Sequence, residues 1–220
     1  IEKAIAITNE AQQAAQKAIT AGNRESDAVA ALEAVFTKNG SFLPAFPSIV
    51  ATGKNATILH YLEEMTPFGK DDAVVVDIGA SFDGYAADIT RTYPVSGSFT
   101  TRQAEIYDMV LAAQQHIAAI AAPGFYMHHP DKPEESLNHM VHAFFEKNGM
   151  GGHMPHSVSH YMGLDVHDVG DRLAPLAPGD VITIEPGLYF PDEGIGVRIE
   201  DDYLITDDGV RCLSPQIKKQ

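Results

Sequence analysis

The feature that most constrains the fold of this chain is an internal repeat. Residues 72–79 (DAVVVDIG) and 180–187 (DVITIEPG) each contain an acidic start, four strand-forming residues, a carboxylate and a glycine two places later. A turn and a second strand with another carboxylate follow each copy, Asp88 in the first and Glu200 in the second. The repeat predicts one unit of helices followed by a hairpin, present twice and folded face to face.

The intervening sequence predicts helices at matching places. Apolar residues at helical spacing predict two helices within residues 1–38. Thr100 and Gln103 form a capping box for a long helix, and Pro133 is a suitable first residue for another that ends at Asn148-Gly149. With strand-like residues at 73–93 and from 151 to about 206, the pattern indicates an α+β protein. Because no low-complexity linker interrupts residues 1–220, a single domain is expected.

Turn chemistry sets the register of the first hairpin. Asp83-Gly84 is a strong two-residue turn signal, so Phe82 should face Tyr85 and Asp77 should lie opposite Thr90. Side chains alternate along a strand, so Asp77 and Asp88 would project from one face as diagonal neighbours, unless a bulge shifts the count.

Four carboxylates brought together by facing hairpins would need a counter-charge. Asp77 and Asp88 alone could be strand-end aspartates that bind backbone amides, but Glu185 and Glu200 recur in the second hairpin. Buried carboxylates are costly unless a cation or a shared proton relieves them. Four negative charges neutralise two divalent cations, and oxygen-rich sites favour Mn²⁺, Mg²⁺ or Ca²⁺ over soft metals.

Three of the ten histidines lie in one short stretch, residues 155–168. If this stretch is extended, His156 and His160 share a face, and imidazole both binds metals and moves protons near neutral pH. The helical His116, His139 and His142 and the loop residues His128, His129 and His153 are expected to have no role in a site.

Composition excludes several classes of function. The formal charge of −15 argues against a nucleic-acid partner, and no apolar run approaches the length of a membrane span. No secretory leader is recognisable, and the single Cys212 cannot form an internal disulfide, which fits the cytosol. The chain opens at Ile1 rather than at Met, as a domain processed or excised from a longer protein would.

Taken together, the motifs resemble the catalytic domain of aminopeptidase P and prolidase. The resemblance rests on Asp77 with Asp88 eleven residues later, residues 156–168, Glu185-Pro186-Gly187, and residues 197–201 (VRIED), and it runs from about residue 58 to 206. It implies a pita-bread fold, in which an antiparallel sheet with a pseudo-twofold internal repeat is covered by helices. It also implies a centre of two divalent metal ions, usually Mn²⁺, with Co²⁺ and Zn²⁺ as alternatives.

Metal ligands follow from the resemblance position by position. Asp77 would hold one ion, Asp88 and Glu200 would bridge both, and His160 and Glu185 would complete the second. Glu185 would also be the general base that takes the proton of an attacking, metal-bridging water.

Further positions of the family match histidines and two other residues in this chain. His60 would position substrate and support proton transfer. His156 and His167 would contact the scissile carbonyl or the proline side and stabilise the tetrahedral intermediate. Arg198 would orient substrate or support the structure, and Tyr189 would line the pocket.

The implied reaction removes the N-terminal residue from peptides with proline in second position. Prolidase activity on Xaa-Pro dipeptides is the nearest alternative, and a catalytically inactive pita-bread binding protein is the alternative from another class. Ser157 stands where many relatives have glycine. The N-terminal domain of full-length relatives is not expected within residues 1–220, and a homodimer is expected by analogy.

Overall fold

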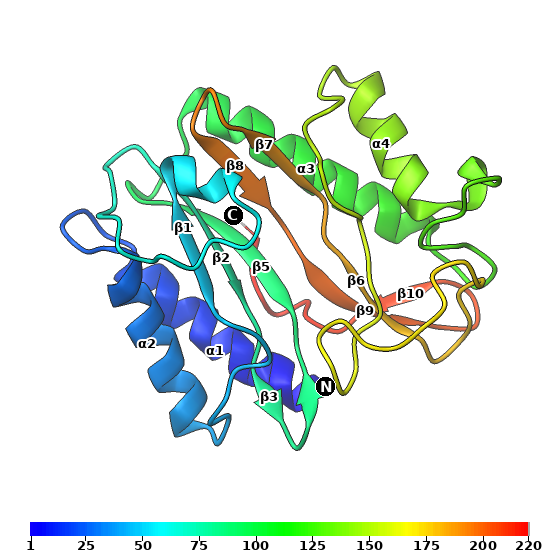
Figure 1. Cartoon of the computed structure of the whole chain (residues 1–220), viewed down its shortest axis with the longest axis horizontal. Helices are drawn as coiled ribbons and strands as arrows, with labels where there is room; N and C mark the ends of the chain where they lie inside the picture. The colour runs from blue at the N-terminus through cyan, green and yellow to red at the C-terminus, as the bar shows by residue number, and fades with distance from the viewer. Residues whose placement is uncertain (220) are drawn as a thin grey trace.

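The computed structural model describes residues 1–219, and in each half two α-helices precede a set of antiparallel strands (Figure 1). The first half consists of α1 (Glu2–Ala18), α2 (Glu25–Lys38), β1 (Ile49–Thr52), the 3₁₀ helix η1 (Gly53–Thr57), β2 (Ala73–Ile78), β3 (Ser81–Phe82), β4 (Tyr85–Ala86) and β5 (Ile89–Pro94). The second half consists of α3 (Thr101–Ile120), the 3₁₀ helix η2 (Pro133–Glu135), α4 (Leu137–Lys147), β6 (Val181–Ile184), β7 (Gly187–Phe190), β8 (Ile195–Arg198), β9 (Asp201–Ile205) and β10 (Val210–Cys212). The predicted repeat of helices followed by a hairpin is therefore confirmed.

Strand pairing is antiparallel between all the named strands. The ladders have the orders β1-β2-β5, β10-β9-β6, β3-β4 and β7-β8. The two halves meet where β5 runs beside the junction of β8 and β9. There the Glu200 N–H donates to the Thr90 carbonyl at 3.1 Å, and the Thr92 hydroxyl donates to the Arg198 carbonyl at 2.9 Å. Strand β5 of the first hairpin thus lies against the β8–β9 junction of the second half.

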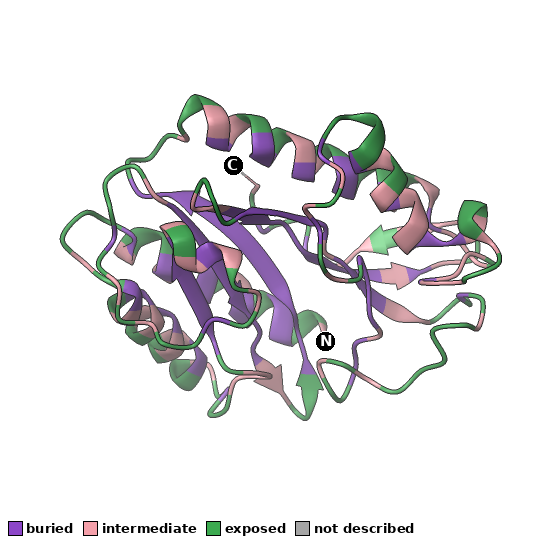
Figure 2. Ribbon diagram, turned by 45° about the horizontal axis from the view of Figure 1, so that its top comes forward, coloured by how far each residue is buried: buried purple, intermediate pink, exposed green. Residues whose placement is uncertain are grey.

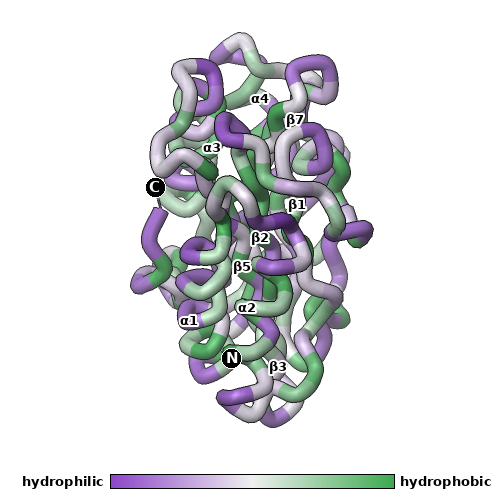
Figure 3. Tube along the Cα trace, turned by 90° about the vertical axis from the view of Figure 1, so that its left-hand side faces the viewer, coloured by the Kyte–Doolittle hydropathy of each residue, from purple (hydrophilic) through white to green (hydrophobic). Residues whose placement is uncertain are grey.

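Helices cover the strands of their own half. In the side view, α1 and α2 lie at one end of the molecule and α3 and α4 at the other (Figure 3). Ile7, Ala11 and Ala15 follow helical spacing along α1, and all three are buried against β2. The central strands are buried, whereas the outer faces of the helices are exposed (Figure 2). No helix within residues 1–219 has the length and apolarity of a membrane span.

One predicted helix begins later than its sequence indicates. The capping box of Thr100 and Gln103 is present at the start of α3, as predicted. The helix expected from Pro133 is instead a 3₁₀ turn that stops at Ser136, where the backbone is extended. Ser136 forms an isolated bridge with Tyr126, and the Leu137 N–H donates to the Tyr126 carbonyl at 2.9 Å. Pairing with a distant residue therefore replaces the first helical turn.

The first hairpin keeps one register from its turn to its base. Phe82 pairs with Tyr85 and Asp77 pairs with Thr90, as predicted, and no extra residue separates the two ladders. Asp77 and Asp88 are therefore diagonal neighbours. In the second hairpin Ile184 pairs with Asp201, so Glu185 and Glu200 are the next residues opposite each other. The repeat thus supplies a carboxylate pair from each hairpin, but the two pairs are placed differently.

The repeated glycines have a steric reason. A Cβ on Gly79 would lie 1.8 Å from the Ala87 carbonyl oxygen, which belongs to the opposite side of the hairpin. A Cβ on Gly187 would lie 2.5 Å from the Tyr189 hydroxyl. Both positions therefore exclude a side chain.

Gly79→Ala should lower the free energy of unfolding by at least about 1–3 kcal/mol, because backbone must move to admit the methyl group. Gly209→Ala is the control, since the nearest atom to its Cβ would be 4.0 Å away. Urea denaturation of both variants measures the difference. Equal stability of the two variants would contradict the close approach at Gly79.

Candidate metal centre

Four carboxylates and one imidazole from both halves of the chain border one cavity of about 490 Å³. Asp77 lies near the end of β2, Asp88 directly precedes β5, Glu185 directly follows β6, and Glu200 directly precedes β9. His160 lies in the segment that runs beside β6. The structure therefore brings together all five residues that the sequence predicts as metal ligands.

Backbone pairing with β6 holds His160 next to Glu185. The Glu185 N–H donates to the Val158 carbonyl at 2.9 Å, and the Thr183 N–H donates to the His160 carbonyl at 3.0 Å. The Thr183 hydroxyl accepts from the His160 N–H at 3.2 Å. Strand-like pairing thus holds residues 158–162, whereas residues 163–167 form bends.

The His160 ring presents one nitrogen to the carboxylates. Its Nδ1 lies 3.0 Å from the Tyr161 carbonyl, which can only accept, so Nδ1 carries the hydrogen and Nε2 has a free lone pair. Nε2 lies 3.4 Å from Asp88 Oδ2, 3.6 Å from Glu185 Oε1 and 4.0 Å from Glu200 Oε1. In histidine metal ligands, the ring nitrogen that does not bind the metal typically makes such a hydrogen bond, which fixes the tautomer.

Two carboxylate oxygens in the centre have no hydrogen-bond partner within the part of the chain that the structure describes. Asp77 accepts from Arg198 Nη2 at 2.7 Å through Oδ2, but its Oδ1 is unpaired. Oδ1 of Asp88 is also unpaired, and both residues are buried. Because buried polar atoms are normally satisfied, these two acceptors are open positions for a cation.

The electrostatics indicate that the carboxylates lack positive charge. Burial, followed by repulsion from neighbouring carboxylates, raises the pKa of Asp88 and of Glu200 well above the ordinary range. Burial also raises the pKa of Glu185 to about 7. A cation among these groups would oppose all three shifts, because it stabilises the ionised form.

The donor set fits divalent ions. Asp88, His160 and Glu200 each offer one ligand atom, and these atoms lie within 4.8 Å of one another. Carboxylate oxygens with one imidazole suit Mn²⁺, Co²⁺ or Zn²⁺. Asp77 and Glu185 border the same cavity and would extend the set to more than one ion.

The other predicted histidines also border the cavity. His60, His156 and His167 line its wall, and the rings of His160 and His167 meet edge to face with centroids 4.2 Å apart. His156 Nδ1 lies 3.7 Å from Glu185 Oε2. Burial, followed by the charge of Arg198, lowers the pKa of His156 to about 4.

Tyr189 lies behind the wall and links two residues that line it. Arg198 Nη1 donates to the Tyr189 hydroxyl at 2.9 Å, and this hydroxyl lies 2.9 Å from His156 Nε2. Since His156 Nδ1 contacts the Ser157 carbonyl, Nε2 is the acceptor of the tyrosine proton. Tyr189 is not among the residues that border the cavity, and it contacts the pocket through His156 and Arg198, so its role at the pocket stays a prediction.

The sequence did not single out the residues that hold the carboxylates from behind. The Thr90 hydroxyl donates to Glu200 Oε2 at 2.7 Å, and the Asp202 carboxylate accepts from the Asp88 N–H at 3.2 Å. For Thr90, the one signal in the sequence was the predicted register of the first hairpin, which places it opposite Asp77. The role of Asp202 depends on contact between the two halves.

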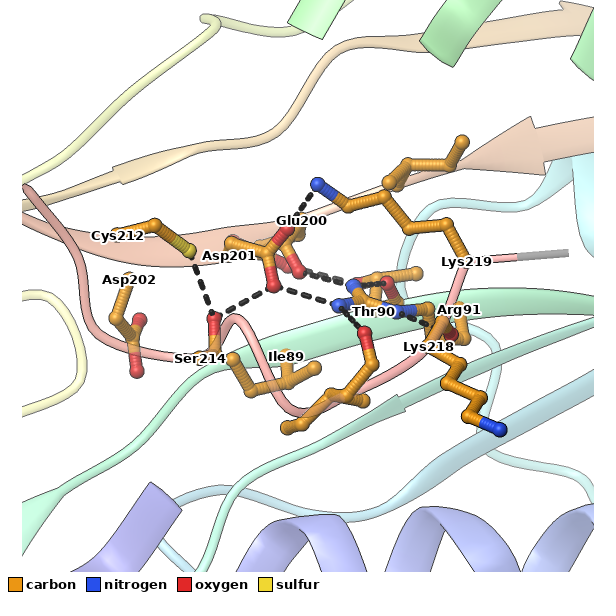
Figure 4. Close-up of polar contacts among 12 residues, drawn as sticks. Ile89, Thr90, Arg91, Glu200, Asp201, Asp202, Cys212, Ser214, Lys218 and Lys219 are labelled. Atoms are coloured by element: carbon orange, nitrogen blue, oxygen red, sulfur yellow. Dashed lines mark hydrogen bonds and ion pairs between the residues drawn. The ribbon is translucent and has the colours of Figure 1, made fainter. Parts of the chain in front are cut away.

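A buried arginine fixes the strand junction at Glu200 (Figure 4). Arg91 is 1% exposed, and all five of its N–H groups donate. Its acceptors are the carbonyls of Thr90 (2.8 Å), Glu200 (2.6 Å), Ile217 (2.8 Å) and Lys218 (3.2 Å) and the carboxylate of Asp201 (2.6 Å). The arginine thus ties β5, the start of β9 and the C-terminal segment together.

Asp201 completes this buried network. Its carboxylate also accepts from Ser214 Oγ at 2.5 Å, Lys219 Nζ at 2.8 Å and Gln114 Nε2 at 3.2 Å. Side chains alternate along a strand, so Asp201 faces away from the cavity while its neighbour Glu200 faces into it. The network therefore supports Glu200 without occupying the site.

Comparison with known proteins is consistent with this geometry. The model of metallopeptidase family M24 matches residues 1–207. The chain belongs to this family. The Xaa-Pro aminopeptidase of Escherichia coli (strain K12) is 39% identical over 210 residues, which is 84% of this chain and 47% of the relative. The Xaa-Pro dipeptidase of Pyrococcus furiosus is 38% identical over 219 residues, which is 97% of this chain and 60% of the relative.

Solved structures of the M24 family share the fold. A variant of E. coli aminopeptidase P in complex with substrate matches with a TM-score of 0.88 and 35% identity, over 100% of this chain and 55% of that one. The α+β pita-bread architecture predicted from the sequence is thus confirmed. This M24 chain spans about half of the aminopeptidase, and it is related at similar identity to aminopeptidases and dipeptidases.

Mn²⁺ should raise the melting temperature of the protein, because the ion binds the folded state. At about 100 times its Kd the gain is about 2.7 kcal/mol, or roughly 5–10 °C for a chain of this size. His160→Ala should abolish most of this rise, whereas His116→Ala, on the exposed face of α3, should retain it. Differential scanning fluorimetry with and without Mn²⁺ makes the comparison. A wild-type melting temperature that no divalent ion shifts would contradict a metal site here.

Proposed function

We propose that this M24 protein is a peptidase that depends on two divalent metal ions and removes the N-terminal residue from peptides with proline in second position. The observation that carries the proposal is the convergence of four carboxylates and His160 at one cavity that three further histidines line. Its relatives at 36–39% identity include Xaa-Pro aminopeptidases. An inactive binding protein is disfavoured because every ligand position of the resemblance is filled.

The proposed metal ligands divide between the two hairpins. Asp77, Asp88, His160, Glu185 and Glu200 would hold the ions, with Asp88 and Glu200 as the carboxylates that both ions would share. When bound, such ions polarise a carbonyl group and ease the ionisation of water. The unpaired oxygens of Asp77 and Asp88 and the free Nε2 of His160 support this assignment.

The remaining chemistry belongs to side chains around the cavity. Glu185, 3.7 Å from His156 and 3.6 Å from His160, accepts the proton of the attacking water. His60, His156 and His167 orient the substrate carbonyl and its proline side. Arg198 holds Asp77 in place and, through Tyr189, fixes the orientation of His156.

The apolar part of the cavity suits a proline ring. Proline has no N–H for the enzyme to grip, so shape must replace that hydrogen bond. The apolar residues that border the cavity are Phe46, Pro47, Ile49, Leu59, Leu62 and Val166. A substrate could therefore place a compact ring against this wall with its scissile carbonyl toward the carboxylates.

One observation favours the prolidase alternative. Arg172 borders the cavity, and among residues 1–219 it makes no hydrogen bond or ion pair. Arg198 also borders the cavity, but Asp77 and Tyr189 already bind its guanidinium. A free arginine at this place suits the terminal carboxylate of a dipeptide. Preference for manganese, a homodimer, a single-domain chain and a cytosolic location stay predictions.

A hydrolysis panel tests the proposed function. With added Mn²⁺, the protein should cleave an Xaa-Pro-Yaa tripeptide and a longer Xaa-Pro peptide before proline, and it should leave a Met-Ala peptide intact. Asp88→Ala should abolish turnover, because it removes a proposed bridging ligand. Mass spectrometry of the products reads out the bond cleaved. Rapid cleavage of Met-Ala would overturn the specificity, and absence of all cleavage with metal bound would overturn the activity.

Arg172→Met should separate the two proline-specific activities. If the guanidinium binds a terminal carboxylate, its loss should lower kcat/KM for an Xaa-Pro dipeptide by about 10–100-fold, the worth of a charge-assisted hydrogen bond. The rate for a longer Xaa-Pro peptide should change little. Arg211→Met, an exposed residue that pairs with Glu2, is the control. An equal loss on both substrates would contradict carboxylate recognition by Arg172.

A further inference from the structure

One wall of the cavity is built from a segment that has little regular structure. Residues 52–66 include η1 and then continue without a strand or helix, yet Leu59, His60 and Leu62 border the cavity. His60 itself is exposed, and no hydrogen bond of its side chain to the rest of residues 1–219 holds it. Its position must therefore be set by the neighbours that anchor the segment.

A buried carboxylate on α2 provides such an anchor. Glu25, the first residue of the helix, is 0% exposed. Its Oε1 accepts from the Thr52 N–H at 2.9 Å and from Asn55 Nδ2 at 3.0 Å. Its Oε2 accepts from the Tyr61 hydroxyl at 3.0 Å and from the Thr66 N–H at 2.9 Å.

These four hydrogen bonds hold the segment at its beginning, middle and end. A buried carboxylate is tolerated only when donors replace its hydration, and hydrogen bonds to an ionised acceptor are the stronger kind. The charge also lies in the first turn of α2, where the helix dipole favours it. Two donors for each oxygen therefore stabilise one conformation of residues 52–66.

Tyr61 transmits this constraint to His60. The Tyr61 ring is 5% exposed and packs with Ile49, Ala51, Ala56 and Val75, while its hydroxyl reaches Glu25. The adjacent His60 is exposed at the cavity. Because Tyr61 is anchored at both its ring and its hydroxyl, the backbone that joins it to His60 has little freedom to move the imidazole away from the site.

We propose that Glu25 is a positioning residue for the active site, which acts through Tyr61 to hold His60 and the neighbouring apolar wall at the cavity. The role of His60 in this inference rests on the proposed function. In this role Glu25 contacts neither the substrate nor a metal ion. The expected consequence is that Glu25 and His60 contribute to the same catalytic step and are energetically coupled.

Glu25→Gln tests the coupling with little change in size. The amide retains one acceptor oxygen, but its NH₂ group would face donors such as a backbone N–H. We expect kcat/KM for an Xaa-Pro peptide to fall about 10–100-fold, as small misplacements of active-site groups do. In a His60→Ala background the same substitution should lower kcat/KM by a clearly smaller factor than in the wild type, because coupled residues are not additive and only the effect on the apolar wall remains. If the double variant instead lost kcat/KM by the product of the two single losses, the role of Glu25 would be merely structural and the proposal would be overturned.

Hydrogen exchange tests the positioning without any activity. Glu25→Gln and Tyr61→Phe should each accelerate amide exchange in residues 52–66, by about 10-fold or more for Glu25→Gln, while α3 stays unchanged. Tyr61→Phe keeps the ring and therefore serves if Glu25→Gln folds poorly. Glu33→Gln is the matched control, because Glu33 also lies on α2 and its carboxylate binds the Ser48 hydroxyl.

The outcomes separate this inference from the proposed function. Unchanged exchange in residues 52–66 for both variants would overturn the positioning role, whatever the enzyme cleaves. A wild-type protein that cleaves no Xaa-Pro substrate, but whose exchange responds as expected, would overturn the proposed function and the role of His60. Anchoring of the cavity wall by Glu25 would survive that result.

Discussion

The structure depends on the cost of burying four carboxylates beside one another. Asp77, Asp88 and Glu200 are buried, and Glu185 lies 3.6 Å from His160, which also lies near Asp88 and Glu200. Such a cluster is stable when cations share its charge or when protons neutralise it. The first solution fits the unpaired oxygens and the fixed histidine tautomer. A metal centre therefore accounts for an arrangement that would otherwise destabilise the fold.

Much of the surrounding structure serves to hold these charges in place. Arg198 binds Asp77, the Thr90 hydroxyl binds Glu200, and Arg91 with Asp201 fixes the backbone behind them. Of these groups, only Arg198 brings positive charge into direct contact with one of the four carboxylates. Such preorganisation matters for catalysis because groups that are already placed need no rearrangement during the reaction.

A substrate would meet two different kinds of wall. Histidines and carboxylates form the polar part of the cavity, and apolar side chains of residues 46–62 together with Val166 form the apolar part. The carboxylates of the polar part lie in or next to paired strands, whereas His60 and the apolar Leu59 and Leu62 depend on an irregular segment anchored by Glu25.

Local sequence determined the hairpins and the carboxylates that they present. The Asp83-Gly84 turn and strand alternation suffice to place Asp77 diagonal to Asp88, because both rules act over a few residues. The repeated pattern likewise predicted that a second hairpin would bring Glu185 and Glu200. Tertiary structure alone decided the start of α4, the location of Tyr189 behind the wall, and the partners that Arg91 and Glu25 bind. Those contacts join residues far apart in the chain, and no local pattern encodes which distant groups will meet.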